Sequence, residues 1–296
     1  MDSRCYLFIF PIRGSDDIPA DYPFAIKQLA FDTGVFLPQD ESNWWTRPPR
    51  FPARLLLLAG RLLHIIPHPL SGEPPVAIPL DDLVQLETGT VLLFGWLKFV
   101  TAKEVLELRY NTRASRPLEI FLRDLKSRWI SQQDPLKITH PQIYGEELDV
   151  KFRFEVSDEI RGEESIVLQY FRAPQQFEHR WFGFRRETGT AGHLLLVTSA
   201  SRLLWVTDHY QNYRELYAAI RHNAPLSTLS DVRLAQEKEQ LFLLLDFQAA
   251  TSWCLPVEQK NEDWSLVRDN LRRLTAGRRK ESTRDSFRSV ASHSAG

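Results

Sequence analysis

The sequence predicts an α+β fold, mainly antiparallel β-sheet, that is arranged as two similar modules. Three observations lead to this prediction. The apolar segment RLLLLAGRLLHIIP (54–67) has a counterpart in HLLLVTSASRLLWVTD (193–208), a Pro-Leu-x-x-Leu segment follows each of them, and an amphipathic helical segment closes each series. Short strand-like segments followed by one helix, twice in the same order, indicate an α+β repeat.

Each apolar segment predicts a β-hairpin, because two apolar runs flank a short turn of small residues. Residues 55–57 align with 194–196, and the Arg-Leu-Leu at 61–63 aligns with the Arg-Leu-Leu at 202–204. The first turn contains Gly60 and the second is Ser-Ala-Ser, and both suit tight backbone geometry.

The Pro-Leu-x-x-Leu segments begin at Pro79 and Pro225, and a strand-like run follows each of them. These runs are VLELRYN (105–111) in the first series and LFLLLDF (241–247) in the second. YRELYAAIRHNAP (213–225) contains good helix formers, but its counterpart in the first series has strand composition. We therefore expect it to be a strand.

Amphipathic spacing predicts the two closing helices, which are the clearest local features of the sequence. In the segment 115–130, Ser115 is the expected N-cap and Pro117 suits the first turn. In the segment 261–274, Asn261 is the expected N-cap. Spacings of three and four residues place two apolar stripes on single faces: Leu118, Phe121, Leu122, Leu125 and Trp129 in the first helix, and Val267, Leu271 and Leu274, with Trp264 above them, in the second.

These features divide the chain into a first module (1–133), a linker (134–149), a second module (150–275) and a disordered basic tail (276–296). The linker is polar and contains two prolines. The tail is rich in serine, poor in apolar residues, and carries five basic against two acidic side chains.

Composition and charge are those of an ordinary soluble protein, with 296 residues, 43% hydrophobic and 25% charged. The net charge of −1 gives no global field toward nucleic acid, so we expect no nucleic-acid partner. Cys5 and Cys254 form neither a disulfide framework nor a Cys-x-x-Cys metal site. No run approaches the roughly 18 apolar residues of a spanning helix, and we expect a cytoplasmic protein.

Catalytic signatures are absent from the sequence, including phosphate-binding loops, nucleophile elbows and metalloprotease motifs. We therefore expect no enzyme activity, no cofactor and no metal. Glu-Thr-Gly-Thr occurs at 87–90 and 187–190, and we interpret both copies as turns rather than phosphate loops. His64 and His68 on an extended strand would lie about 13 Å apart, too far to share a metal ion.

The order of motifs resembles a known family. Arg-Leu-Leu (61–63), Ile-Pro-Leu-Asp-Asp-Leu (78–83), a Phe-Gly-Trp-Leu strand (94–97) and the closing helix are similar to the bacterial pleckstrin-homology-like (PH-like) domains and, more loosely, to the GRAM group. The resemblance implies two bent β-sandwich or barrel modules of seven strands, each capped by a C-terminal helix. It also implies a binding protein, since many members bind phosphoinositides or protein partners. The chain departs from phosphoinositide binders in lacking their compact Lys-x-n-Arg-x-Arg pattern.

The most suggestive binding segment is YFRAPQQFEHRWFGFRRETG (170–189). The resemblance implies that it lies on early strands of the second module, where phosphoinositide-binding members carry basic residues. Guanidinium groups suit phosphate, and an aromatic ring beside them suits a membrane interface. The candidate contacts with an anion or lipid are Arg172, Arg180, Arg185, Arg186 and Trp181. The alternative is an ordinary strand with an apolar inner face and solvated arginines.

A second candidate is DESNWWTRPPRFP (40–52), in which Trp44, Trp45 and Arg47 would contact a partner. One Trp of an adjacent pair on an extended segment points away from the core. The alternative is that this segment packs against the second module.

We therefore expect a non-catalytic scaffold that presents a surface to an unidentified protein partner. The alternative is a peripheral membrane adaptor, at the inner membrane surface, that binds anionic lipid or phosphate headgroups through the basic-aromatic segment of the second module. An enzyme with an unrecognised site is a third alternative. The sequence does not indicate the oligomeric state.

Overall fold

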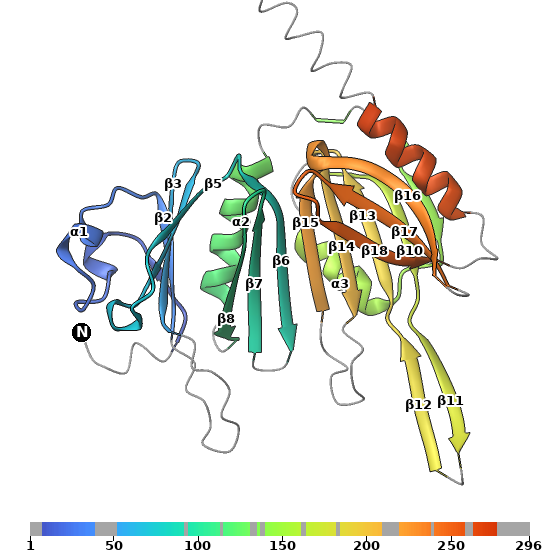
Figure 1. Ribbon diagram of the computed structural model, residues 1–296, viewed down its shortest axis with the longest axis horizontal. Coiled ribbons are helices and arrows are strands. Elements are labelled where there is room, and N and C mark those ends of the chain that lie inside the picture. The colour runs from blue at the N-terminus through green and yellow to red at the C-terminus, as the bar shows by residue number, and fades with distance from the viewer. Residues whose placement is uncertain are drawn as a thin grey trace, which may run out of the picture. The chain divides into compact units, whose positions relative to one another are not determined.

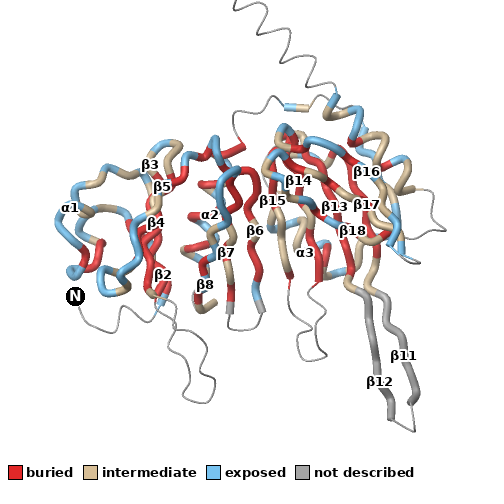
Figure 2. The backbone as a smooth tube through the Cα atoms, in the orientation of Figure 1, coloured by how far each residue is buried: buried red, intermediate tan, exposed pale blue. Residues whose placement is uncertain are grey.

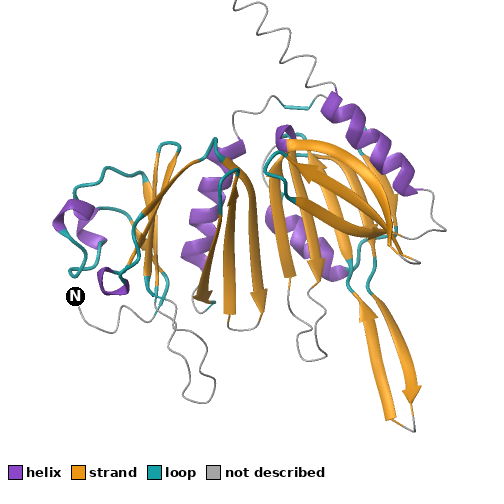
Figure 3. Cartoon of the chain, in the orientation of Figure 1, coloured by secondary structure: helices purple, strands orange, loops and turns teal. Residues whose placement is uncertain are grey.

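The computed structural model describes residues 8–38, 52–91, 94–112, 115–130, 135–136, 140–160, 164–181, 184–208, 219–237, 240–257 and 263–276, and of residues 91, 94 and 175–190 it describes the backbone only. Strands predominate over helices, and nearly all neighbouring strands are antiparallel (Figure 3). The predicted α+β class is therefore confirmed.

The chain divides into two compact units. Unit 1 comprises Met1–Gln132 and Asp208–His222, and unit 2 comprises Gln133–Thr207 and Asn223–Gly296. The segment Asp208–His222, which we expected in the second module, is thus grouped with the first.

Unit 1 contains two sheets with helix α2 (Arg116–Ile130) between them (Figure 1). The first sheet has the order β1 (Phe10–Ile12), β2 (Thr33–Leu37), β3 (Arg54–Ala59), β4 (Leu62–Pro67) and β5 (Val76–Pro79). In the second sheet, β7 (Phe94–Thr101) pairs with β6 (Leu83–Val91) and with β8 (Val105–Asn111). Short helices occur in the connections: η2 (Ser15–Asp17), α1 (Phe24–Lys27) and η3 (Pro69–Ser71).

The apolar stripe of α2 faces the core, as its spacing predicts. Every residue of the stripe is buried: Leu118, Phe121, Leu122, Leu125 and Trp129. Trp129 also donates from Nε1 to the carbonyl of Leu83, at 2.9 Å, where β6 begins. The helix therefore fastens the second sheet at the same time as it fills the space between the sheets.

Strand β3 is buried on both faces, which explains its unbroken leucine run. Leu55, Leu56, Leu57 and Leu58 are all 0% exposed. Leu55 and Leu57 pack with Ile12, Ile18 and Tyr22, which come from the segment before β2. A strand covered on both faces has no polar side, so its sequence does not alternate.

Unit 2 has a similar order of elements, with the β11–β12 hairpin added. The strands of the second half of the chain are β9 (Gln142–Gly145), β10 (Ile166–Arg172), β11 (Gln175–Trp181), β12 (Phe184–Thr190), β13 (His193–Thr198), β14 (Arg202–Asp208), β15 (Ala219–Pro225), β16 (Leu229–Glu237), β17 (Gln240–Phe247) and β18 (Ser252–Val257). The first residues of β15, up to His222, are grouped with unit 1. β13 lies between β10 and β14, and β17 lies between β16 and β18. The helices are α3 (Val150–Glu159), η4 (Leu226–Thr228) and the helix of residues 263–276.

Helix α3 is the counterpart in unit 2 of the segment that covers β3. Its Phe152 is 0% exposed and packs with Phe171, Leu194 and Leu196. The strand interiors of both units are accordingly buried (Figure 2). We did not predict α3, because only one of its faces carries a buried aromatic and its exposed side includes Phe154.

A repeated irregularity supports the alignment of the two units. The pairing of β6 with β7 shifts register between Leu83 and Gln85, and the pairing of β16 with β17 shifts between Leu229 and Asp231. Both bulges come directly after the Pro-Leu segment. Because a bulge bends its strand, we expect a similar bend in β6 and in β16.

The hairpin turns correct our alignment by one residue. Leu80 donates its N–H to the carbonyl of Arg61, and Leu226 donates to the carbonyl of Ser201, each at 2.8 Å. Arg61 therefore corresponds to Ser201, not to Arg202. The reason is that the second turn is one residue longer, so that Arg202 is already the first residue of β14.

The predicted linker contains regular structure. Within 134–149, β9 pairs in parallel with β10, and Asp149 caps α3 by accepting from the N–H of Phe152 at 2.9 Å. The helix of residues 263–276 holds β9 in place, since Asp263 accepts from the N–H of Gly145 at 3.0 Å. Linker composition failed as a guide because β9 is short, half exposed and fixed by side chains from a distant element.

Both Glu-Thr-Gly-Thr segments lie in strands, so our turn interpretation was wrong. Residues 87–90 belong to β6 and residues 187–190 to β12. In β6, Gly89 pairs with Trp96 of β7, and a Cβ atom at Gly89 would lie 2.0 Å from the Trp96 ring. The glycine is required there by the close approach of the indole, not by a turn.

Candidate functional site

The β11–β12 hairpin carries most of the predicted binding residues. Its strands pair only with each other among the described strands, as a two-stranded sheet that is separate from the rest of unit 2 (Figure 1). It is inserted between β10 and β13, which pair directly with each other. The core of unit 2 is thus continuous beneath the insertion.

The register of the hairpin groups its residues by charge. Arg180 pairs with Arg185, and Glu178 pairs with Glu187. Because alternate residues share a face, these four positions lie on one face of the ribbon. The other face carries Phe177, Trp181 and Phe184, and also the His179–Arg186 pair. One face of the hairpin is therefore charged, and the other is aromatic with one arginine.

The arginines are concentrated at the end of the ribbon. The run Arg-Trp-Phe-Gly-Phe-Arg-Arg (180–186) contains three arginines, three aromatic residues and no acid. Residues 182–183 at its centre lie outside the described residues. Arg186 pairs with His179, next to the Arg180–Arg185 pair. Arg180, Trp181, Arg185 and Arg186 thus share one end of the ribbon, with Arg180 and Arg185 on one face and Trp181 and Arg186 on the other.

Arg172 does not belong to this group. It is 9% exposed, and its guanidinium donates to the carbonyl of Pro256 in β18 at 3.3 Å. Its neighbour across the sheet is His193, at the base of the inserted hairpin. We therefore withdraw Arg172 from the candidate anion contacts, because its charge serves an internal contact between strands.

The second predicted site is outside the described residues. Trp44, Trp45 and Arg47 lie in the segment 39–51, and nearly all of the predicted tail lies in 277–296. Both therefore stay predictions.

A polar cluster around Glu87 was not predicted. Trp96 Nε1 donates to Glu87 Oε1 at 2.7 Å, and Lys98 Nζ lies 3.2 Å from both carboxylate oxygens. His222 Nδ1 lies 3.6 Å from Glu87 Oε2. Desolvation by burial lowers the pKa of His222 to about 4, against the opposing effect of Glu87. The imidazole is therefore neutral near pH 7. The pairing of β6 with β7 brings Glu87 close to Lys98 and Trp96, and His222 comes from β15, so no local sequence signal reveals the cluster.

A second buried cluster surrounds Arg202. Its guanidinium lies 3.2 Å from Glu159 Oε2 and 3.1 Å from Glu164 Oε2. It also donates to the backbone carbonyl of Glu159 at 2.8 Å. Arg202 and the Glu159 side chain are almost fully buried. The cluster joins the end of α3 and the start of β10 to the turn before β14, which is a structural role.

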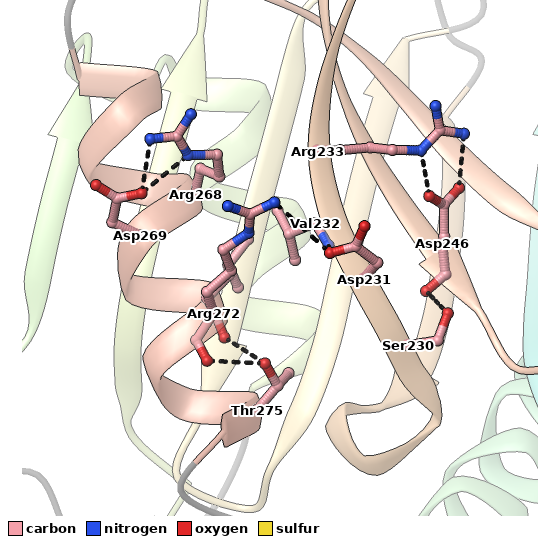
Figure 4. A network of polar contacts seen from close by, with 10 residues as sticks. Ser230, Asp231, Val232, Arg233, Asp246, Arg268, Asp269, Arg272 and Thr275 are labelled. Atoms are coloured by element: carbon pink, nitrogen blue, oxygen red, sulfur yellow. Dashed lines mark hydrogen bonds and ion pairs between the residues drawn. The ribbon is translucent and has the colours of Figure 1, made fainter.

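Surface ion pairs lie on the closing helix of unit 2 and on its three-stranded sheet, and the pair Arg272–Asp231 joins the two (Figure 4). Arg272 lies 3.7 Å from Asp231 on β16, and Arg233 lies 2.6 Å from Asp246 on β17. The Arg233 contact is the main cause that lowers the pKa of Asp246. Arg268 and Asp269, which are neighbours on the helix, form an ion pair with each other. These charges form ion pairs within the unit.

The described residues contain no group of three or more histidine, cysteine or carboxylate side chains that could hold a metal ion. No helix in the described part of the chain is long and apolar enough to cross a membrane. Comparison with known proteins gives no relative: no protein-family model matches the sequence, and no curated protein matches it. The hairpin is therefore the best candidate site on its own geometry.

Proposed function

We propose that this chain is a non-catalytic binding protein built from two PH-like modules, and that the β11–β12 hairpin contacts its protein partner. The support for PH-like modules is the element order. Neighbouring strands, a set of three further strands with a bulge after the Pro-Leu segment, and a closing helix occur as β2–β8 and α2. They recur in the same order as β10, β13–β18 and the helix of residues 263–276.

The hairpin carries the functional proposal because it contributes to no other sheet. An isolated two-stranded hairpin is only marginally stable in water, so a fold gains little from it. Trp, Tyr and Arg are the residue types that dominate binding energy at protein interfaces. The hairpin places Trp181 beside Arg180 and opposite Phe184, at the end farthest along the ribbon from β10.

Affinity capture with the full chain as bait tests this proposal. The variant is Trp181→Ala, and the matched control is Trp264→Ala on the closing helix of the same unit. We expect proteins that the native and control baits retain to be lost from the Trp181→Ala bait. The same set of retained proteins on all three baits would contradict the proposal.

One observation favours a second function, that of a peripheral membrane adaptor. The run 180–186 combines a charge of +3 with three aromatic residues and contains no acid. Arginine binds phosphate as a planar fork, and aromatic rings partition to the headgroup region of a bilayer. The ligand in this case is an anionic lipid headgroup, and the contacts are Arg180, Arg185 and Arg186 with Trp181.

Vesicle co-sedimentation separates the two functions. A membrane adaptor would sediment with vesicles that contain phosphatidylserine, and would be released as salt is raised. Arg185→Ala/Arg186→Ala would abolish sedimentation, whereas the control Arg272→Ala/Arg273→Ala, an exposed arginine pair on the closing helix, would not. If the native chain does not sediment with anionic vesicles at low salt, the adaptor function is excluded.

A further inference from the structure

Strand β8 ends the second sheet of unit 1. Among the described strands it pairs with β7 alone, so its other side is an edge of the sheet. Its side chains alternate, with Leu108 and Tyr110 buried, and Val105, Glu107 and Arg109 exposed. An edge of this kind is a template for a further strand unless it is blocked.

The equivalent edge in unit 2 is blocked. The two units can be aligned on the register shift between β6 and β7 and the matching shift between β16 and β17. The pairings of β7 with β8 and of β17 with β18 then place Pro256 of β18 at the position of Arg109 of β8. Proline has no N–H to donate to a neighbouring strand, and the carbonyl of Pro256 already accepts from Arg172. In β8 the first of these devices is absent, because Arg109 has a backbone N–H and the strand VLELRYN contains no proline.

We propose that β8 pairs with β8 of a second copy of this chain, antiparallel and across a two-fold axis at Leu108. The charges of β8 are complementary to those of a second, antiparallel copy of the same strand. An antiparallel pair across a two-fold axis must centre on one residue, and centring on Leu108 puts Glu107 of each chain opposite Arg109 of the other. Centring on Glu107 or on Arg109 would instead place like charges opposite each other, which is unfavourable.

The remaining pairs of this register are compatible. Leu106 lies opposite Tyr110, and Val105, which is 56% exposed, lies opposite Asn111. Glu107 and Arg109 already form an ion pair within one chain, at 2.8 Å. In the dimer the same side chains form an array of four alternating charges. The interface is isologous, as expected for a two-fold homodimer.

Charged residues on an edge strand can also serve to prevent strand addition. Sedimentation velocity over a wide range of protein concentration distinguishes these roles. We expect concentration-dependent dimerisation of the native chain. Each of the single variants Glu107→Arg and Arg109→Glu creates two pairs of like charges across the interface. Each should therefore raise the dissociation constant of the dimer at least about tenfold. Both positions are exposed, so the variants should fold normally.

Charge exchange makes the test specific. The double variant Glu107→Arg/Arg109→Glu restores every opposite-charge pair and should dimerise as the native chain does. An equimolar mixture of the two single variants should form a heterodimer, although neither forms a homodimer. A native chain that stays monomeric at all concentrations would overturn the proposal, and so would a dimer that the single variants leave unchanged. Binding of a partner at the hairpin does not enter this measurement, so its outcome is independent of the proposed function.

Discussion

Gly89 has a packing role that substitution reveals. A Cβ atom there would lie 2.0 Å from the Trp96 ring, which itself is held by Glu87. Gly89→Ala should therefore destabilise the chain by about 1–3 kcal/mol, the usual cost of overpacking. Urea denaturation of the variant measures this cost. Gly14→Ala is the control, since a Cβ atom at Gly14 meets nothing within 4 Å. Equal stability of the two variants would show that Trp96 does not lie over Gly89.

His222 should make stability depend on pH. Its folded pKa is about 4, lowered from 6.5 chiefly by desolvation. Between these values the unfolded state binds the proton and the folded state does not, so stability falls as pH drops from about 6.5 to about 4. The loss is on the order of 3 kcal/mol at most.

The His222→Gln variant should lose less stability than the native chain between pH 7 and pH 5. Urea denaturation at both pH values measures the difference. The exposed His140 provides the control, because His140→Gln should leave the native pH dependence intact. A pH dependence of His222→Gln identical to that of the native chain would contradict a buried neutral imidazole.

At the scale of elements, the Arg202 cluster should anchor α3 and β10 to the β13–β14 turn. Arg202→Leu leaves the carboxylates of Glu159 and Glu164 without their cation, and should cost about 3–5 kcal/mol. The comparison variant is Arg61→Leu on the corresponding turn of unit 1, where the arginine is partly exposed, pairs with Asp81 at 2.6 Å and donates to the carbonyl of Arg128. That variant should cost less, about 1–2 kcal/mol. Comparable losses in the two variants would contradict the structural role of the buried cluster.

The contact between β9 and the closing helix should be visible by hydrogen exchange. Asp263→Ala removes the acceptor of the Gly145 N–H. We expect faster exchange of the Gly145 amide and its neighbours in β9, while protection in β13 is retained. Unchanged protection of Gly145 would mean that β9 does not depend on the helix.

Sequence patterns predicted the elements whose burial is periodic or continuous. The stripe of α2 was recognised because Leu118, Phe121 and Leu125 share one face, and β3 because its leucines are buried on both faces. The patterns failed where side chains from distant elements decide the structure. β9 depends on Asp263, and the strand position of Gly89 depends on Trp96.

The candidate site was predictable in composition but not in geometry. The sequence indicates a cluster of arginines and aromatic residues between 170 and 189. It does not indicate that Arg172 ends β10 and turns inward, whereas Arg180 and Arg185 pair across a separate ribbon. That difference comes from the insertion of a hairpin between two strands that pair directly, which a linear pattern of charges does not encode.

At the scale of the whole molecule, each unit has its own core, and the hairpin is an addition to the second. Because β10 pairs with β13 directly, the core of unit 2 does not need the ribbon. If the ribbon binds the partner, as we propose, then stability and binding reside in different parts of unit 2. The core and the buried clusters determine stability, and the ribbon supplies the proposed contacts.

The most direct test replaces residues 175–190 by a short glycine-containing turn and measures the free energy of unfolding and partner or vesicle binding on the same preparation. The account predicts a free energy of unfolding within about 1 kcal/mol of the native value, since an isolated hairpin contributes little, together with complete loss of binding. A large loss of stability, or binding that survives without the ribbon, would contradict it.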